Sequence, residues 1–365
     1  MRRLTVILGV PLDEVTLAEA VARIAAFARR RDRPRQVATA NTDFVARAQS
    51  DARFRDILRR ADLVTADGMP LVWASRLLGG RLPERVAGAD LVPALAGYCA
   101  REGLSLYLLG ARPEVARAAA TRLQEWHPRL RLAGVHSPPL AALEAMDHED
   151  ILRRLEATRP DVLLVAFGSP KQEEWIARHA RVLPVPVAVG VGGSLDFLAG
   201  HTRRAPAWVQ RAGAEWLWRL GNEPRRLWRR YAFDLAAFGG PLARHLLVAR
   251  RLAGVRGGLG GEGSVWVDGK GALRVQGALD AGTRERFEVA AGQALAPGRA
   301  VAVVLAECTF LDSAGLGCLA ALCHRARELG GDIRLIDVPP PIRRLLRPAR
   351  LDTYLNCAPP AEARS

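Results

Sequence analysis

The sequence has little lysine and no long apolar run. Only Lys171 and Lys270 are lysines among the 53 Lys and Arg residues, so arginine carries the formal charge of +15. Heavy arginine use can reflect GC-rich coding, so the total charge identifies no partner by itself. No stretch approaches 18 uninterrupted apolar residues, which argues against a membrane-spanning helix. The apolar run after Arg2 and Arg3 breaks at Asp13, too early for a secretory signal.

Cysteine and histidine are also sparse. The cysteines form no CxxC pair and no zinc-like spacing, and an odd, scattered set is typical of free thiols in a reducing cytoplasm. They are Cys99, Cys308, Cys318, Cys323 and Cys357. The sequence contains no Ser/His/Asp or Cys/His signature, and no pattern calls for a cofactor or a metal ion.

The first two hundred residues alternate short apolar runs with helix-period segments. Continuous apolar strands separated by helices predict a Rossmann-like α/β fold, with a parallel sheet covered on both faces and ligands at the carboxyl ends of the strands. The expected helices include Thr16–Arg30, Pro113–Trp126 and Pro170–Arg181. The expected strands are Leu4–Val10, Arg35–Ala40, Leu63–Ala66, Ser105–Leu109, Asp161–Ala166 and Val185–Val191.

Composition divides the rest of the chain. Residues 201–253 form a basic appendage, because the stretch 201–256 holds twelve Arg, three acidic residues and four of the eight Trp. Residues 254–263 contain six glycines and are typical of a flexible linker. Residues 264–365 form a second, smaller α/β domain after the core of residues 1–200. Its expected strands are Val265–Val267, Leu273–Gly277, Ala300–Leu305 and Ile333–Asp337, and its helices begin at Thr283 and Ser313.

Three glycine turns in the core follow strands and open helices. They lie at Gly110, at Gly168 before Pro170, and at Gly192. Free backbone amides and the helix dipole at such turns form an anion site that suits a diphosphate. Any glycine turn in an α/β sheet has the same appearance, so the pattern alone leaves both interpretations open.

Polar residues follow two other buried strands. Asp67 stands beside Gly68 after one strand and is a reasonable general base, or else a cap of the next helix. The segment 39–43, TANTD, follows the other strand. Further along, Arg85 and Asp90 could bind substrate or pair across a loop.

The basic appendage combines tryptophan with arginine at helical spacing. Rings at the headgroup level and guanidinium groups on phosphate suit an anionic membrane surface. A solvated charged helix is the alternative, and no nucleic-acid-binding motif is present. The residues expected at the membrane are Trp208, Trp216, Arg225, Arg226, Trp228, Arg229 and Arg230.

Six blocks in order give the core and appendage a family resemblance. TANTDF, ADGMP, RVAGAD, FGSPKQEEWI, GVGGSLDFLAGHTRRAPAW and GAEWLWRLGNEPRRLWRRY resemble the WecG/TagA/CpsF family of glycosyltransferases over residues 4 to 233. The resemblance implies a metal-independent, inverting transfer from a UDP-sugar to a polyprenyl-diphosphate-linked sugar at the cytoplasmic face of the membrane. The absence of an Asp-x-Asp pair agrees with metal-independent chemistry. The sugar, of ManNAc, ManNAc uronic acid, glucose or glucuronic acid type, stays open.

The same resemblance implies functions for individual residues of the site. Asp67 would be the base, and Arg203 or Arg204 would contact the diphosphate. Ala214 departs from the family, which usually has Leu there. The substrate pocket would include Thr39, Asn41, Gly68, Arg85, Asp90 and Gln172, and the nucleotide would lie against Gly110, Gly168, Pro170 and Gly192.

LRVQGALDAGT and FLDSAGLGCL resemble STAS domains, the fold of bacterial anti-sigma factor antagonists, over residues 264 to 356. In that family the serine corresponding to Ser313 can be phosphorylated by a partner kinase; the alternative is that Asp312 and Ser313 only cap a helix. A regulatory protein partner is expected here. A rival interpretation makes the whole chain a signalling protein with a degenerate front domain, but Asp67, Thr39 and Gln172 are all intact.

Overall fold

The computed structural model describes residues 1–200, 205–206, 209, 215–222, 228, 235–256, 263–347 and 350–357. The chain forms two compact units. The first, here called the sheet unit, comprises Val15–Pro70 and Pro83–Ala232. The second, the C-terminal unit, comprises Met1–Glu14, Leu71–Leu82 and Phe233–Ser365.

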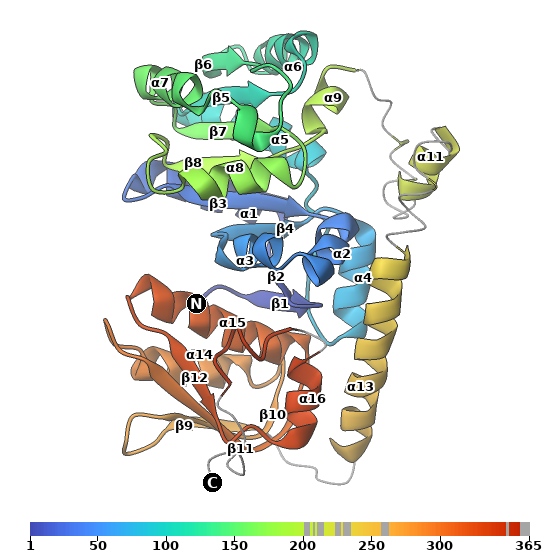
Figure 1. Ribbon diagram of the computed structural model, residues 1–365, viewed down its shortest axis with the longest axis vertical. Helices are drawn as coiled ribbons and strands as arrows, with labels where there is room; N and C mark the ends of the chain where they lie inside the picture. Colours follow the sequence, from blue (N-terminus) through green and yellow to red (C-terminus); the bar gives the residue numbers. More distant parts are fainter. Residues whose placement is uncertain are drawn as a thin grey trace. The chain divides into compact units, whose positions relative to one another are not determined.

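The sheet unit is built on six parallel strands in the order β4-β3-β8-β7-β5-β6 (Figure 1). This confirms the predicted parallel α/β fold. The edge strand β6 was missed in the sequence because its residues are half-buried or exposed, which weakens its apolar pattern. The strands are β3 (Arg35–Ala40), β4 (Leu63–Ala66), β5 (Ser105–Gly110), β6 (Arg131–His136), β7 (Val162–Ala166) and β8 (Val187–Gly190).

Helices cover both faces of this sheet. Successive residues of β5 point to opposite cores: Leu108 packs with α1, α5 and α6, whereas Leu109 packs with α7 and α8. The helices are α1 (Leu17–Arg30), α2 (Thr42–Ser50), α3 (Ala52–Arg60), α5 (Gly88–Glu102), α6 (Pro113–Trp126), α7 (His148–Thr158), α8 (Lys171–His179), α9 (Ser194–Leu198) and α11 (Glu215–Asn222), with a 3-10 turn at Leu143–Ala145. Helix α4 (Met69–Leu77) begins in the sheet unit and passes into the C-terminal unit at Leu71.

The N-terminal strand does not join the parallel sheet. The single strand expected over Leu4–Val10 was wrong, because Leu8 and Gly9 both take positive φ, 47° and 83°, and reverse the chain. The result is an antiparallel hairpin of β1 (Leu4–Ile7) and β2 (Val10–Asp13).

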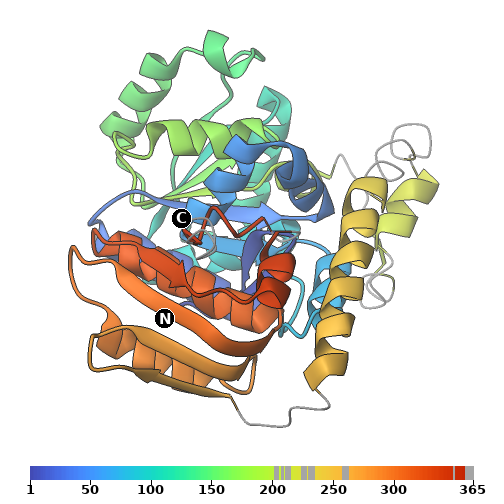
Figure 2. The same ribbon diagram turned by 60° about the horizontal axis from the view of Figure 1, so that its bottom comes forward.

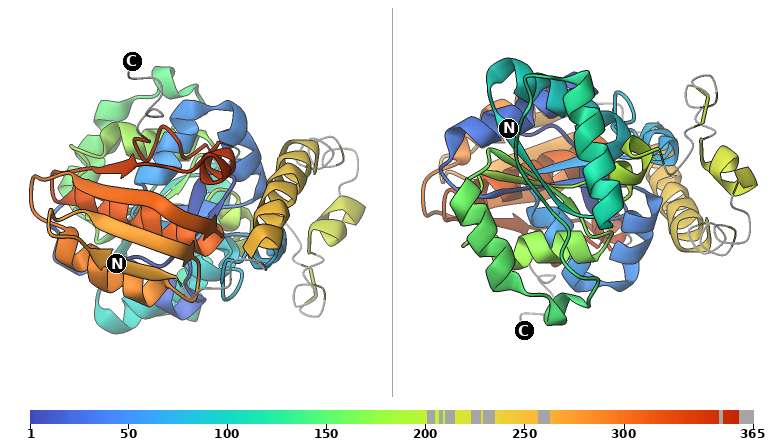
Figure 3. Two further views of the ribbon diagram at one scale, coloured as in Figure 1. Left: turned by 90° about the horizontal axis from the view of Figure 1, so that it is seen from below. Right: turned by 90° about the horizontal axis from the view of Figure 1, so that it is seen from above.

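The C-terminal unit contains a mixed sheet in the order β12-β11-β10-β9 (Figures 2 and 3). Every element predicted for this region is present, which confirms the small α/β domain. The elements are β9 (Ser264–Val267), β10 (Leu273–Leu279), α14 (Arg284–Ala294), β11 (Val301–Leu311), α15 (Ser313–Glu328), β12 (Ile333–Ile336) and α16 (Pro340–Leu346), preceded by a π-helical turn (Leu235–Gly239) and α13 (Gly240–Arg256). The domain boundaries at 200, 253 and 263 stay predictions, and linker residues 257–262 lie outside the described part of the chain.

The N-terminal hairpin completes the core of the C-terminal unit. Leu4 and Val6 are buried in the same apolar cluster as the strands and helices of residues 264–356. A Cβ on Gly317 of α15 would collide with the carbonyl oxygen of Leu4, so only glycine allows the hairpin to approach this closely. The Glu14 carboxylate pairs with the Arg284 guanidinium, which lowers the pKa of Glu14 against the opposing effect of burial.

Candidate functional site

The carboxyl ends of the parallel strands meet at one edge of the sheet unit. The segments that follow β3, β4, β5, β7 and β8 all leave from this edge. They carry most of the predicted substrate and nucleotide residues, so the sheet topology brings together side chains from Thr39 to Gly192. Open parallel sheets bind their ligands at this edge.

Asp67 lies where β4 ends. Its backbone N–H donates to the carbonyl of Ala40 at 2.7 Å, which holds the end of β4 beside the end of β3. Its Oδ2 accepts from the backbone N–H of Gly88, the first residue of α5, at 3.4 Å. The positive end of the dipole of this fifteen-residue helix therefore lies next to the Asp67 carboxylate. Asp67 is half-buried, so part of its surface is open to solvent.

The side chains of Thr39 and Gln172 both form hydrogen bonds with the backbone at the end of β8. The buried Thr39 hydroxyl donates to the carbonyl of Gly190 at 2.9 Å. The Gln172 Oε1 accepts from the backbone N–H of Gly192 at 2.9 Å. Both side chains therefore fix the glycine turn that opens α9, a role that the sequence did not indicate.

Glu173 is a residue of this site that sequence reasoning missed. Its side chain is completely buried, and its Oε1 accepts from the Gln172 amide at 2.6 Å. Burial raises its pKa to about 8, partly offset by the hydrogen bond from Gln172. A Cβ on Gly190 would lie 2.8 Å from both side chains, so a glycine is needed where they pack beneath β8. In the sequence Glu173 is one of two adjacent glutamates, and nothing marks which one is buried.

The Arg85 side chain pairs with two carboxylates. It donates to Asp90 at 2.8 Å and to Glu215 at 2.5 Å. The first pair is the loop pairing that was one alternative in the sequence. The second ties α11, in the basic appendage, to the edge that carries Asp67 and was not foreseen. Arg85 is thus partly neutralised and well placed to hold the appendage.

The N-cap residues of α5, α6, α8 and α9 make no side-chain hydrogen bond to the first turn, whereas those of α1, α2, α3 and α7 each make one. In α5, the carboxylate of Asp67 accepts from one of these first-turn amides instead. Uncapped first turns leave amides for an anionic ligand. The turns before them need glycine, because Gly110, Gly168 and Gly192 have φ of 100°, 79° and 50°. Pro170 is the N-cap residue of α8.

Two of the remaining candidates have structural duties. The Asn41 side chain caps α2 by accepting from the backbone N–H of Phe44 at 3.2 Å. Gly68 has a φ of 151°, which turns the chain from Asp67 into α4.

Of the residues expected at the membrane, Trp228 is 56% exposed. The predictions for Arg203, Arg204, Trp208, Arg225, Arg226, Arg229 and Arg230, and for the side chain of Trp216, lie outside the described residues.

Ser313 lies in the C-terminal unit, and its hydroxyl is buried. The Ser313 Oγ donates to the carbonyl of Val6 in the N-terminal hairpin at 2.5 Å. Its backbone N–H donates to the carbonyl of Leu78 at 2.9 Å. Asp312 caps α15 by accepting from the N–H of Gly315 at 2.7 Å, and burial raises the pKa of Asp312 to about 6.

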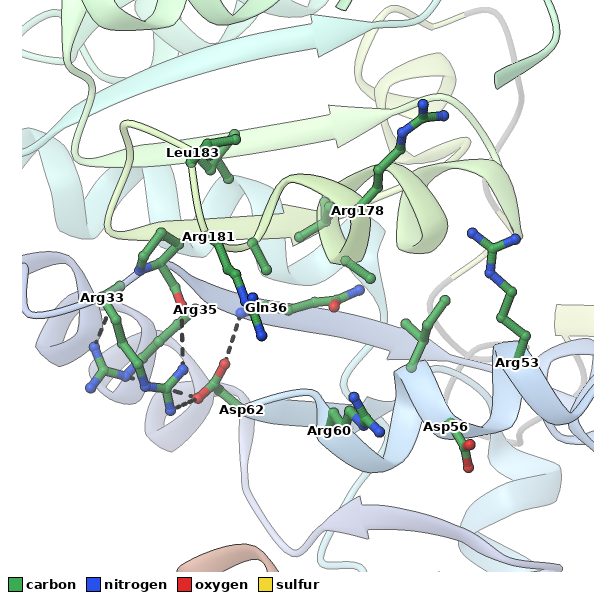
Figure 4. Close-up of a pocket in the computed structure, with 16 residues that line it drawn as sticks. Arg33, Arg35, Gln36, Arg53, Asp56, Arg60, Asp62, Arg178, Arg181 and Leu183 are labelled. Atoms are coloured by element: carbon green, nitrogen blue, oxygen red, sulfur yellow. Dashed lines mark hydrogen bonds and ion pairs between the residues drawn. The ribbon is translucent and has the colours of Figure 1, made fainter. Parts of the chain in front are cut away.

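A cavity of about 650 Å³ lies at the opposite end of the sheet unit, near the start of β3 (Figure 4). Arginines from β3, α3 and α8 line it, with Asp56 and Asp62 among them. It contains none of the predicted site residues. The carboxyl edge, with its carboxylate and uncapped helices, is the better candidate for chemistry.

A parallel α/β sheet with a half-buried carboxylate and helix N-termini at one edge is typical of enzymes that bind phosphorylated ligands. The family model of the glycosyl transferase WecG/TagA/CpsF family matches residues 5–252. The chain therefore belongs to this family and is a glycosyltransferase. The model of the Mlab, STAS domain matches residues 264–356, which confirms the predicted fusion.

Two relatives carry the same name, N-acetylglucosaminyldiphosphoundecaprenol N-acetyl-beta-D-mannosaminyltransferase. The protein from Bacillus subtilis (strain 168) is 30% identical over 194 residues, 53% of this chain and 73% of the relative. The protein from Staphylococcus aureus (strain MRSA252) is 32% identical over 224 residues, 61% of this chain and 86% of the relative. In the described part of this chain, no helix has the length and apolarity needed to span a membrane.

Proposed function

We propose that this glycosyltransferase moves a sugar from a UDP-sugar to a sugar on a polyprenyl diphosphate, at the cytoplasmic face of the membrane, with inversion and without a metal ion. The observation that carries the proposal is the Asp67 carboxylate at the N-terminus of α5, on an edge shared with the glycine turns. The names of the two relatives support the acceptor, since both specify a diphosphoundecaprenol-linked N-acetylglucosamine. They also make N-acetylmannosamine the first donor sugar to test.

The chemistry needs one base and one anion site. The Asp67 carboxylate takes the proton of the acceptor hydroxyl as its oxygen forms a bond to the anomeric carbon. The bond from that carbon to UDP breaks on the opposite face, and UDP leaves with the electron pair. A single displacement inverts the anomeric centre. The first-turn amides of α6 and α8 and the glycine turns stabilise the departing diphosphate.

Release of UDP tests the proposal directly. The full chain is given a panel of UDP-sugars, UDP-N-acetylmannosamine first, with a short-chain prenyl-diphosphate-linked N-acetylglucosamine and EDTA. Asp67→Asn keeps the acceptor for the Gly88 amide but removes the base, so kcat is expected to fall about a hundredfold or more. Acceptor-dependent turnover that Asp67→Asn leaves intact would refute the assigned base, and turnover that EDTA abolishes would refute the metal-independent mechanism.

We propose further that the STAS domain adjusts this activity through a protein partner. The covalent fusion motivates the proposal, and phosphorylation of Ser313 stays a prediction. Because the hydroxyl bonds Val6, a kinase could reach it only after α15 separates from the hairpin. Deletion of residues 264–365 would expose Leu4 and Val6 and confuse regulation with misfolding. Ser313→Ala in the full chain removes the phosphate acceptor with a smaller effect on stability, and polymer output that it leaves unchanged under every growth condition would contradict the Ser313 prediction.

A further inference from the structure

Helix α4 has an outer face of tryptophan, arginine and leucine. Its inner face, which includes Leu71 and Val72, is buried, whereas Trp73 is 40% and Leu77 is 60% exposed. Arg76 lies between them on the exposed face. A large ring and a leucine left in water on a single turn of helix commonly mark a contact surface.

Helix α13 presents a similar exposed stripe. Leu247 is 60% exposed, and Arg244 and Arg250 are exposed one turn before and after it. Both α13 and the exposed part of α4 belong to the C-terminal unit, and they lie side by side in all views (Figures 1, 2 and 3). Neither helix contains an acidic residue. We call Trp73, Arg76, Leu77, Arg244, Leu247 and Arg250 the α4–α13 face.

We propose that the α4–α13 face docks on an anionic phospholipid bilayer, with Trp73, Leu77 and Leu247 in the headgroup region and the arginines on lipid phosphates. This inference rests on the proposed function, which supplies a lipid-linked acceptor. The single sign of charge favours a bilayer over a second copy of the chain, because a two-fold contact would set arginine against arginine. Apolar side chains interleaved with guanidinium groups are the composition of interfacial helices.

The position of α4 in the chain links the proposed bilayer contact to Asp67. The helix begins at Met69, two residues after Asp67, and its exposed face ends at Leu77. At 1.5 Å per residue, the α4 part of this face, Trp73, Arg76 and Leu77, lies within about 12 Å of the start of α4 along the helix axis. A bilayer held there presents an acceptor sugar near the base while the prenyl chain stays in lipid.

The test compares two double variants of the full chain in vesicle binding without donor or acceptor. Trp73→Gln/Leu77→Gln removes the apolar part of the face. Trp126→Gln/Leu140→Gln is the matched control, because Trp126 and Leu140 are 51% and 102% exposed outside the face. Partitioning to phosphatidylglycerol-containing vesicles is expected to fall about tenfold in the first variant and to stay unchanged in the control. Arg244→Glu/Arg250→Glu, at exposed positions that should not affect folding, is expected to weaken binding to these vesicles but not to pure phosphatidylcholine.

Activity and self-association separate the remaining outcomes. Turnover of a water-soluble short-chain acceptor should be equal in wild type and Trp73→Gln/Leu77→Gln, whereas turnover of a long-chain acceptor in vesicles should fall. Unchanged vesicle partitioning in both the glutamine and the arginine variants overturns the inference. So does a wild-type oligomer, seen by sedimentation, that Trp73→Gln/Leu77→Gln dissociates without a change in vesicle binding. Absence of turnover with every donor contradicts the proposed function only, because the vesicle measurements do not depend on it.

Discussion

The buried Glu173 makes the stability of the sheet unit depend on pH in a predictable direction. Burial raises its pKa from the ordinary value of 4.5 to about 8. The folded chain therefore keeps this proton, whereas the unfolded chain loses it above pH 4.5. The contribution of Glu173 to the free energy of unfolding is fully present below pH 4.5 and is lost as pH rises towards 8. In this range, release of the proton lowers the free energy of the unfolded state but not that of the folded state.

The size of the effect follows from the shift. Each pKa unit corresponds to about 1.4 kcal/mol. Between pH 4.5 and 7, the folded state loses about 3 kcal/mol of stability relative to a chain with no ionisable group there. Glu173→Gln is such a chain, and its amide oxygen can still accept the Gln172 hydrogen bond. The variant is thus expected to gain stability over wild type as pH rises.

Urea unfolding at several pH values measures this gain. Hydrogen–deuterium exchange of α8 peptides assigns it to the sheet unit. Glu174→Gln is the matched control, because it removes a partly exposed carboxylate from the same helix turn. A difference between Glu173→Gln and wild type that stays constant over this pH range would refute the neutral, buried carboxyl.

Two further predictions concern the C-terminal unit. Gly317→Ala pushes a methyl group into the carbonyl of Leu4 and should lower the free energy of unfolding by about 2 kcal/mol or more, measured by thermal unfolding. The control Gly292→Ala, on α14 with open space around it, should be neutral or stabilising. Equal effects of the two substitutions would contradict the close packing of the hairpin. Ser313→Asp places a carboxylate against the carbonyl of Val6 and should cost about 2 kcal/mol or more, whereas Ser313→Ala should cost about 1 kcal/mol; a stable Ser313→Asp protein would show that the hydroxyl is accessible.

Much of the fold could be predicted because its signals are local. Buried strands of the parallel sheet are continuous apolar runs. Helices such as Pro113–Trp126 are predicted by the helical spacing of their apolar residues and by an initial proline. The glycines at the carboxyl ends of the strands are visible for the same reason, since a positive φ favours that residue. Ordered motif blocks then identified both families, which the comparisons confirmed.

The residues that hold the candidate site together could not be found in the same way. Glu215 lies 130 residues from Arg85, and Val6 lies 307 residues from Ser313. No local pattern states which of two adjacent glutamates is buried, or which serine faces a distant carbonyl. Burial and pairing at such separations depend on how the elements pack.

The sequence by itself determined the class of fold, the order of its elements and the family, because those depend on periodicity, turn chemistry and motif order within short windows. Only the tertiary structure decided that the first fourteen residues complete the C-terminal unit and that Gln172 and Glu173 support the β8 turn. The physical reason is that the chain reverses at Leu8 and Gly9, so the apolar side chains of β1 must be buried against another element. Helix α15 can bury them because Gly317 has no side chain and lets the backbone of Leu4 approach closely.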